Sequence, residues 1–115
     1  MINRYSLPEM NQIWTEKNKF NKWLEIEIAV CEALAEIDEI PKQDVDLIKE
    51  NASFTVSRIK EIEQETRHDI LAFLTAVAES LGEESKYIHM GLTSSDIKDT
   101  ARALQMKEAV ELIVN

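Results

Sequence analysis

The sequence contains few residues that interrupt helices. Only two glycines and two prolines occur among 115 residues, well below the ordinary usage of either residue. Both residue types disfavour helix interiors, so their scarcity predicts long helical segments. Abundant Glu, Lys, Ala, Leu and Ile favour the same structure. We therefore expect an all-α fold.

Cysteine is also nearly absent. Cys31 is the single cysteine, which excludes an internal disulfide and favours a reducing compartment. It lies in an apolar run, so a core position is expected rather than a nucleophile. The N-terminus shows no apolar signal-peptide region, and no apolar run approaches the length that spans a bilayer. We expect a cytoplasmic protein with no membrane segment.

Basic residues are outnumbered by acidic ones, 13 to 22. The formal net charge is -9, which argues against a nucleic-acid groove, because such a groove needs a basic face. A phosphate ligand remains compatible, since it needs only local positive groups. The two histidines stand 21 positions apart without a cluster of other ligands, and no metal site is expected. Phosphate-binding glycine loops, a Cys-x-x-Cys pair and a nucleophile elbow are all missing from the sequence.

Apolar residues recur at helical spacing through most of the chain. They predict a short helix from near residue 6 to near 14, and helices over 15–38, 41–51, 55–65, 66–81 and 94–114. Gly82 is a stop signal, residues 83–86 are expected as a polar loop, and residues 87–90 are expected to be extended or irregular. In the second helix the apolar positions fill two stripes. Its acidic residues, Glu25, Glu27, Glu32 and Glu36, are expected to face solvent or to lie at a rim.

Three Ser/Thr-x-x-acid signatures, beginning at Ser6, Thr66 and Thr93, predict helix starts. A helix N-terminus attracts anions, above all phosphate, although capping alone is the commoner role. The second signature places Arg67 and His68 in the first turn of a helix, where cations are disfavoured. A bound anion would remove that cost; otherwise both side chains point into water or pair with Glu63 or Glu65.

Three segments together resemble one enzyme family. They are residues 4–10 (RYSLPEM), 66–73 (TRHDILAF) and 87–101 (YIHMGLTSSDIKDTA). Each is similar to a motif of the bacterial adenylosuccinate lyases, they occur in the family's order, and the resemblance covers the whole chain. It implies the helical N-terminal domain of the fumarase/aspartase superfamily over residues 1–93, followed by the start of a long central-bundle helix over 94–115.

The resemblance also implies a reaction. The family splits adenylosuccinate into AMP and fumarate, and splits the succinylated imidazole-carboxamide ribotide of purine synthesis in the same way. A base removes a proton beside a carboxylate, and an acid protonates the departing nitrogen. The family uses no metal or organic cofactor. It is a homotetramer whose active sites each draw residues from three subunits.

Matched residue by residue, the family motifs imply a nucleotide-binding role for Arg4 and Tyr5. They imply substrate binding by Arg67, His68 and Asp69, with His68 close to the chemistry and therefore the candidate catalytic residue. Thr93 and Ser94 match substrate contacts, and His89 matches a histidine near the phosphate.

One departure from the family is its length, since family members run several times longer. Their later histidine acid and the serine-rich loop that supplies the base are absent from this sequence, so the chain alone is expected to be inactive. Two alternatives stay open: a superfamily lyase acting on a non-nucleotide succinyl compound, and a non-catalytic helical interaction module.

Overall fold

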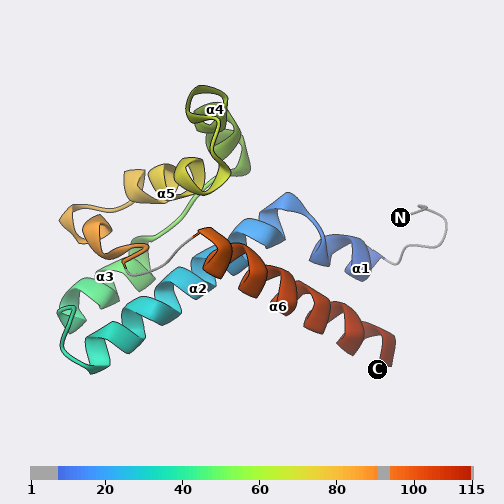
Figure 1. Ribbon diagram of the computed structural model, residues 1–115, viewed down its shortest axis with the longest axis horizontal. Helices are drawn as coiled ribbons and strands as arrows, with labels where there is room; N and C mark the ends of the chain where they lie inside the picture. The colour runs from blue at the N-terminus through green and yellow to red at the C-terminus, as the bar shows by residue number, and fades with distance from the viewer. Residues whose placement is uncertain (1–7, 91–93, 115) are drawn as a thin grey trace.

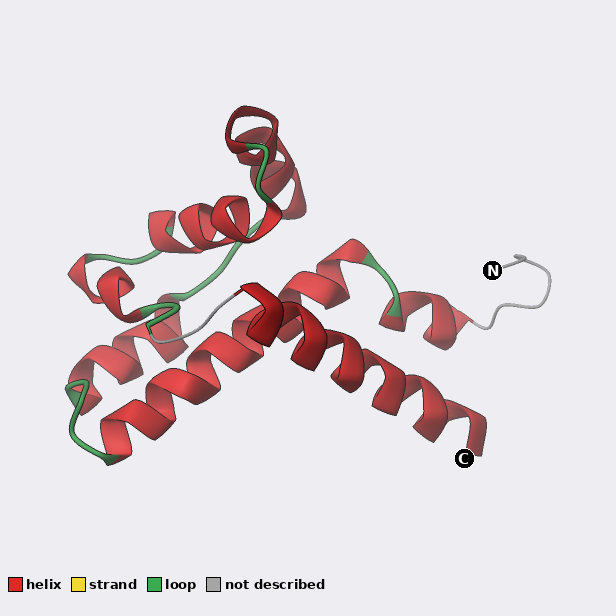
Figure 2. Ribbon diagram, viewed as in Figure 1, coloured by secondary structure: helices red, strands yellow, loops and turns green. Residues whose placement is uncertain are grey.

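The computed structural model describes residues 8–90 and 94–114, with the backbone alone for 94 and 95. Its elements are α1 (Pro8–Ile13), α2 (Glu16–Glu36), α3 (Lys42–Asn51), α4 (Val56–Thr66), α5 (Asp69–Glu79), the 3₁₀ helix η2 (Glu83–Tyr87) and α6 (Ser94–Val114). No strand occurs within these ranges (Figure 2). The prediction of an all-α fold is confirmed, and most helix ends lie within two residues of the predicted ones.

The long helix α2 is the element around which the others pack. Helix α6 crosses it near its middle, and α3 runs back beside its C-terminal half (Figure 1). Thr15 caps its start, because the Thr15 hydroxyl accepts a hydrogen bond from the Asn18 N–H at 3.1 Å. Helix α4 opens in the same manner, with Thr55 accepting from the Arg58 N–H at 3.2 Å.

Two clusters of buried side chains form the core. The larger one joins α2, α4, α5 and α6 and consists of Phe20, Trp23, Ile59, Ile62, Ile70, Ala72, Phe73, Ala76, Val77, Ile97 and Ala101. Its aromatic centre stacks Phe20 on Phe73 with ring centroids 6.0 Å apart, and Trp23 meets Phe73 edge-on at 5.4 Å. The smaller one fixes α3 against α2 through Cys31, Ala35, Ile40, Val45 and Ile48.

The inward face of α2 differs from the predicted one at one residue. The buried positions are Phe20, Trp23, Glu27, Cys31 and Ala35. Glu27 was expected to face solvent or to lie at a rim, and this prediction is wrong, since only 1% of the residue is exposed. Ile37 is 66% exposed because α2 has already ended.

The junction between α4 and α5 also corrects a prediction. Arg67 adopts a left-handed conformation, with φ 57° and ψ 27°, and its N–H donates to the Glu63 carbonyl at 2.7 Å. This conformation ends α4 at Thr66, so Thr66 cannot cap the next helix. Arg67 and His68 therefore lie outside the first turn of α5, which begins at Asp69. The carboxylate of Glu79 then ties α5 back to α4, accepting two hydrogen bonds from the Arg58 guanidinium at 2.7 and 3.0 Å.

The C-terminal end of α5 comes earlier than predicted. Ser80 caps α5, its hydroxyl donating to the Val77 carbonyl, so the helix stops at Glu79 rather than at Gly82. The segment expected as a polar loop forms η2, with the Ser85 N–H donating to the Gly82 carbonyl at 3.1 Å. The Glu84 carboxylate accepts from the Gly82 N–H at 2.8 Å and stabilises this turn.

Helix α1 is held between α2 and α6 by one carbonyl. The Ile13 carbonyl accepts hydrogen bonds from Asn18 Nδ2 at 2.7 Å and from Gln105 Nε2 at 2.9 Å. Gln105 is buried, so its amide needs such a partner. The sequence pattern did not indicate this role for Gln105.

Beyond this contact, the C-terminal half of α6 presents apolar side chains to solvent. The exposed ones are Met106, Val110, Leu112, Ile113 and Val114. Ile97 and Ala101, nearer the start of α6, are instead buried in the core. Across the described ranges, no helix combines the length and apolar character needed to cross a membrane.

Candidate functional site

His68 is the N-cap residue of α5. Its Nδ1 accepts a hydrogen bond from the Leu71 N–H at 3.1 Å. A ring nitrogen that accepts carries no proton, so the capping ring is neutral and bears its proton on Nε2. The residue is exposed. The structure therefore presents His68 as an Nε2–H donor at the start of a helix.

Arg67 precedes His68 on the exposed side of the junction. Its side chain lines a shallow groove of about 360 Å³ together with Lys60, Glu63 and Gln64. Ion pairs from Arg67 to Glu63 or Glu65, one of the alternatives from the sequence, are not formed in the described part of the chain. The Arg67 guanidinium and the His68 imidazole N–H are neighbouring donors that can bind an anion.

Asp69 links the second sequence motif to the third. Its carboxylate lies 2.9 Å from Lys98 Nζ, on the first turns of α6, and also accepts from the Ile70 N–H at 2.8 Å. Partial burial acts to raise the pKa of Asp69, but the hydrogen bond and charge of Lys98 outweigh it, so this pKa is lowered. The ion pair brings the starts of α5 and α6 together.

A cleft opens beside this ion pair. It has a volume of about 360 Å³ and is lined by Lys19, Trp23, Asp69, Lys98, Asp99, Arg102 and Gln105. Three of these side chains are cationic and two are anionic. In a chain of net charge -9, this local balance suits an anionic ligand.

The buried carboxylate of Glu27 holds His89 through two contacts. Glu27 Oε1 accepts from the His89 backbone N–H at 2.6 Å, and Glu27 Oε2 lies 2.6 Å from His89 Nδ1. Burial raises the pKa of the Glu27 carboxyl, and the hydrogen bonds and charge of His89 offset this rise only in part. Glu27 was not among the candidate residues predicted from the sequence. Helical spacing allows Glu27 to share a face with Phe20, Trp23 and Cys31, but no signal in the sequence identifies a partner for its carboxylate.

Cys31, one turn further along α2, supports the same segment. Its thiol lies 3.6 Å from the Tyr87 carbonyl and donates to it. Burial, with the nearby carboxylates of Glu27 and Glu32, raises the pKa of the thiol to about 11. A protonated, buried thiol is a poor nucleophile, which agrees with the expected core role.

Of the remaining candidate residues, only Ser94 lies among those that the structure describes. Arg4, Tyr5 and Thr93 lie outside the described residues, as does Ser6. Ser94 begins α6. No hydrogen bond or ion pair joins His68 to His89 among the residues that the structure describes. No group of three metal-ligating side chains occurs in the same residues.

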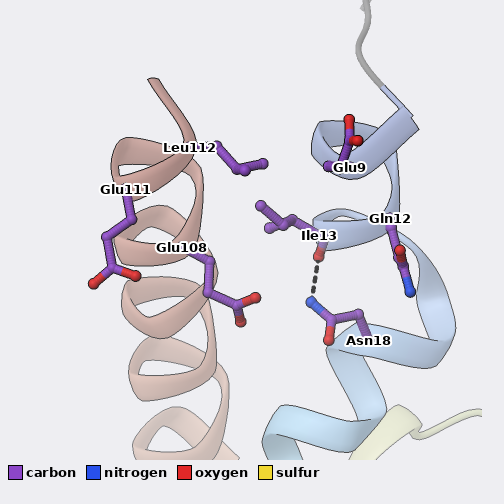
Figure 3. A pocket seen from close by; sticks show the side chains of 7 residues that line it. All are labelled: Glu9, Gln12, Ile13, Asn18, Glu108, Glu111 and Leu112. Atoms are coloured by element: carbon purple, nitrogen blue, oxygen red, sulfur yellow. Dashed lines mark hydrogen bonds between the residues drawn. The ribbon is translucent and has the colours of Figure 1, made fainter. Parts of the chain in front are cut away.

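A second groove, of about 460 Å³, lies between α1 and α6 (Figure 3). Its lining includes Glu9, Glu108 and Glu111 beside Ile13 and Leu112. The Glu108 carboxylate is neutralised by Lys22 Nζ at 2.6 Å, but Glu9 and Glu111 would repel an anion. We therefore place the candidate site at the starts of α5 and α6 and not in this groove.

The chain is similar to known lyases over nearly its whole length. The family described as Lyase matches residues 3–115. The adenylosuccinate lyase of Bacillus subtilis (strain 168) is 56% identical over 114 residues, which is 99% of this chain and 26% of that protein. The adenylosuccinate lyase of Streptococcus mutans is 58% identical over 113 residues, or 98% of this chain and 26% of that protein.

A solved structure shares the fold. The fumarate lyase from Mesorhizobium sp. BNC1 superposes with a TM-score of 0.81 at 26% identity, covering 90% of this chain and 25% of that one. The chain thus spans about a quarter of the length of the relatives that it matches. On this evidence the chain belongs to the lyase family.

Proposed function

We propose that this chain is the N-terminal part of an adenylosuccinate lyase. The full enzyme would cleave adenylosuccinate to AMP and fumarate, and the succinylated aminoimidazole carboxamide ribotide to its carboxamide and fumarate, within purine biosynthesis. The observation that carries the proposal is the identity of 56% and 58% to two adenylosuccinate lyases over nearly the whole chain.

The proposed reaction is a β-elimination. A general base takes a proton from the carbon beside a carboxylate of the succinyl group. The resulting carbanion expels the nitrogen, the C–N bond breaks, and a general acid protonates that nitrogen. The substrate carries a phosphate and two carboxylates, so its binding requires several cationic and N–H groups.

The candidate residues suit this demand. His68 would act next to the reacting atoms through its Nε2–H, with Arg67 and Asp69 binding the substrate beside it. Arg4, Tyr5, His89, Thr93 and Ser94 would complete the substrate contacts. The chemistry needs no metal or organic cofactor, and the general acid and base would come from other parts of a homotetramer.

The proposal extends to the organisation of the chain. Residues 1–93 would form the N-terminal helical domain, and residues 94–115 would begin the central helical bundle. The exposed apolar side chains of α6, Met106, Val110 and Ile113 among them, are what a helix of such a bundle requires. The enzyme would act in the cytoplasm on a small-molecule nucleotide and bind neither nucleic acid nor membrane.

An assay of the full-length protein that contains this chain tests the proposal. We expect fumarate to be released from adenylosuccinate and from the ribotide, and none from an N-succinyl compound without a nucleotide. Release of fumarate only from the non-nucleotide compound would favour another superfamily lyase. No release from any of the three would favour a non-catalytic helical module.

A further inference from the structure

We infer that Glu27 is a positioning residue that holds His89 in the orientation needed to bind an anionic group of the substrate. The inference rests on the proposed function for the identity of the substrate. It rests on the structure for the contact between the two residues.

The contact has two points of attachment. One oxygen of Glu27 accepts from the backbone N–H of His89 and the other meets ring Nδ1, both at 2.6 Å. The backbone of His89 is left-handed, with φ 67°. This conformation is uncommon for a residue with a side chain and persists where neighbouring groups hold it. Glu27 fixes the backbone and the ring together.

Burial makes the carboxylate an unusual choice for this role. Glu27 lies in the middle of the inward face of α2, between Trp23 and Cys31, and is 1% exposed. An apolar residue would suit that face at lower cost, because burying a carboxylate is unfavourable unless its oxygens are hydrogen-bonded. Both oxygens find their partner on a single residue 62 positions away. This points to a requirement of His89 rather than of the core.

The arrangement decides which ring atom meets a ligand. Nδ1 is directed at Glu27, so Nε2 alone is left for other partners. The His89 side chain is 20% exposed, and Nε2 has no hydrogen-bond partner among the described residues. Because the Glu27 carboxylate accepts at Nδ1, a proton on Nε2 would be donated outward, to a phosphate or carboxylate oxygen.

The test is a set of variants in the full-length protein. Glu27→Gln keeps the size of the side chain but removes the charge, and its amide nitrogen cannot accept a hydrogen bond from the ring. We expect the KM for adenylosuccinate to rise about tenfold or more, the scale of a lost charge-assisted hydrogen bond, with a smaller change in kcat. Glu36→Gln makes the same chemical change at an exposed position of α2 and should leave KM unchanged.

Two competitive inhibitors identify the group that His89 binds. Inorganic phosphate represents the nucleotide phosphate, and succinate represents the carboxylates. We expect Glu27→Gln to weaken inhibition by one of them about tenfold and to leave the other unchanged. In a background of His89→Ala, Glu27→Gln should produce no further rise in KM, because the residue through which Glu27 acts is gone.

The structure of the variant supplies a measurement that does not depend on activity. A crystal structure of Glu27→Gln should show His89 with a changed ring orientation or outside the left-handed region. Inactive wild-type protein with the predicted crystallographic change would refute the proposed function and retain the positioning role. Active wild-type protein with an unaltered KM and unaltered inhibition constants in Glu27→Gln would overturn the inference. Should Glu27→Gln fail to fold, Glu27→Asp replaces it, and wild-type constants in that variant would overturn the inference as well.

Discussion

The ring of His68 accepts the backbone N–H of Leu71 through Nδ1 at 3.1 Å, and so the candidate catalytic histidine is itself the cap of α5. An imidazolium has no acceptor nitrogen, so protonation of His68 would require loss of the cap. The helix start and the site chemistry are therefore coupled through one nitrogen atom.

Two substitutions of His68 in the full-length enzyme distinguish its capping role from its proposed catalytic role. The Asn amide oxygen can take the place of Nδ1, whereas the Gln amide reaches the position of Nε2. We expect His68→Gln to lower kcat by roughly a hundredfold or more, the scale of a positioned proton-transfer group. His68→Asn should lose activity to a similar extent while retaining the cap. Steady-state kinetics across pH, with assembly checked by sedimentation, measure the effect.

The same two variants should differ in stability. Loss of an N-cap costs about 1 kcal/mol, so His68→Gln should unfold at lower denaturant concentration than His68→Asn. Near-wild-type turnover with an unchanged pH profile in either variant would remove the ring of His68 from the mechanism.

The ion pair of Asp69 with Lys98 predicts a pH-dependent stability. Both side chains are partly exposed, so Asp69→Asn should cost less than about 1 kcal/mol near neutral pH. The pKa of Asp69 in the folded protein lies below its ordinary value of 3.8. The stabilisation is therefore complete well above that value and is lost as the pH falls through the folded pKa.

Urea unfolding at a series of pH values checks this expectation. The difference between wild type and Asp69→Asn should shrink as the pH is lowered from about 7 to about 2. Asp99→Asn is the matched control, since Asp99 lines the same cleft but forms no ion pair within the described residues. A difference that grew on acidification would show that the ion pair does not stabilise the fold.

Phe73 is expected to be a major contributor to stability. It is fully buried and touches the rings of Phe20, Trp23 and Phe54. Phe73→Ala should lower the free energy of unfolding by about 3–5 kcal/mol, because it leaves a cavity at the centre of the larger cluster. Leu71→Ala, on the same helix at 49% exposure, should change it by less than about 0.5 kcal/mol. Comparable losses in the two variants would contradict the packing described here.

The apolar side chains of α6 predict self-association of the 115-residue chain. Val110 is 56% exposed and Ile113 is 74% exposed, on a helix face that nothing covers in the described structure. Exposed apolar patches favour association, so sedimentation should show a concentration-dependent oligomer. Replacing both residues with Lys should shift the chain toward monomer. A wild-type chain that stays monomeric at high concentration would count against this prediction.

The 115-residue chain should not cleave adenylosuccinate by itself. The resemblance assigns the general acid and base to family segments absent from this sequence, and each such group contributes a factor of about 10²–10⁴ to the rate. Fumarate release by a contaminant-free preparation would show that the catalytic groups lie within these residues.

Local rules predicted the helices well because helices depend on neighbouring residues. Thr15 and Thr55 cap α2 and α4 through the N–H three residues on, and the apolar spacing predicted α6 over its observed range. Where two local signals competed, the prediction was wrong. Thr66 begins a capping signature, but the left-handed conformation of Arg67 ends α4 at Thr66. His68 is therefore the residue that caps α5.

The candidate site was predicted less completely than the helices. The motifs gave His68, Asp69 and His89 as candidate site residues, but did not give Lys98 or Glu27 as their partners. Lys98 reaches Asp69 only because α6 packs at the start of α5. No spacing within the chain encodes that contact.

The sequence by itself determined that this protein is helical, where its helices lie, and which family it belongs to, because periodicity, capping and motif order are properties of consecutive residues. The tertiary structure alone decided that Glu27 is buried. Its neighbours in sequence mark it as one of several surface acids, and its burial depends on the packing of residues 87–89 against α2. Burial of a charge is favourable only where a distant partner satisfies it, and here that partner is His89.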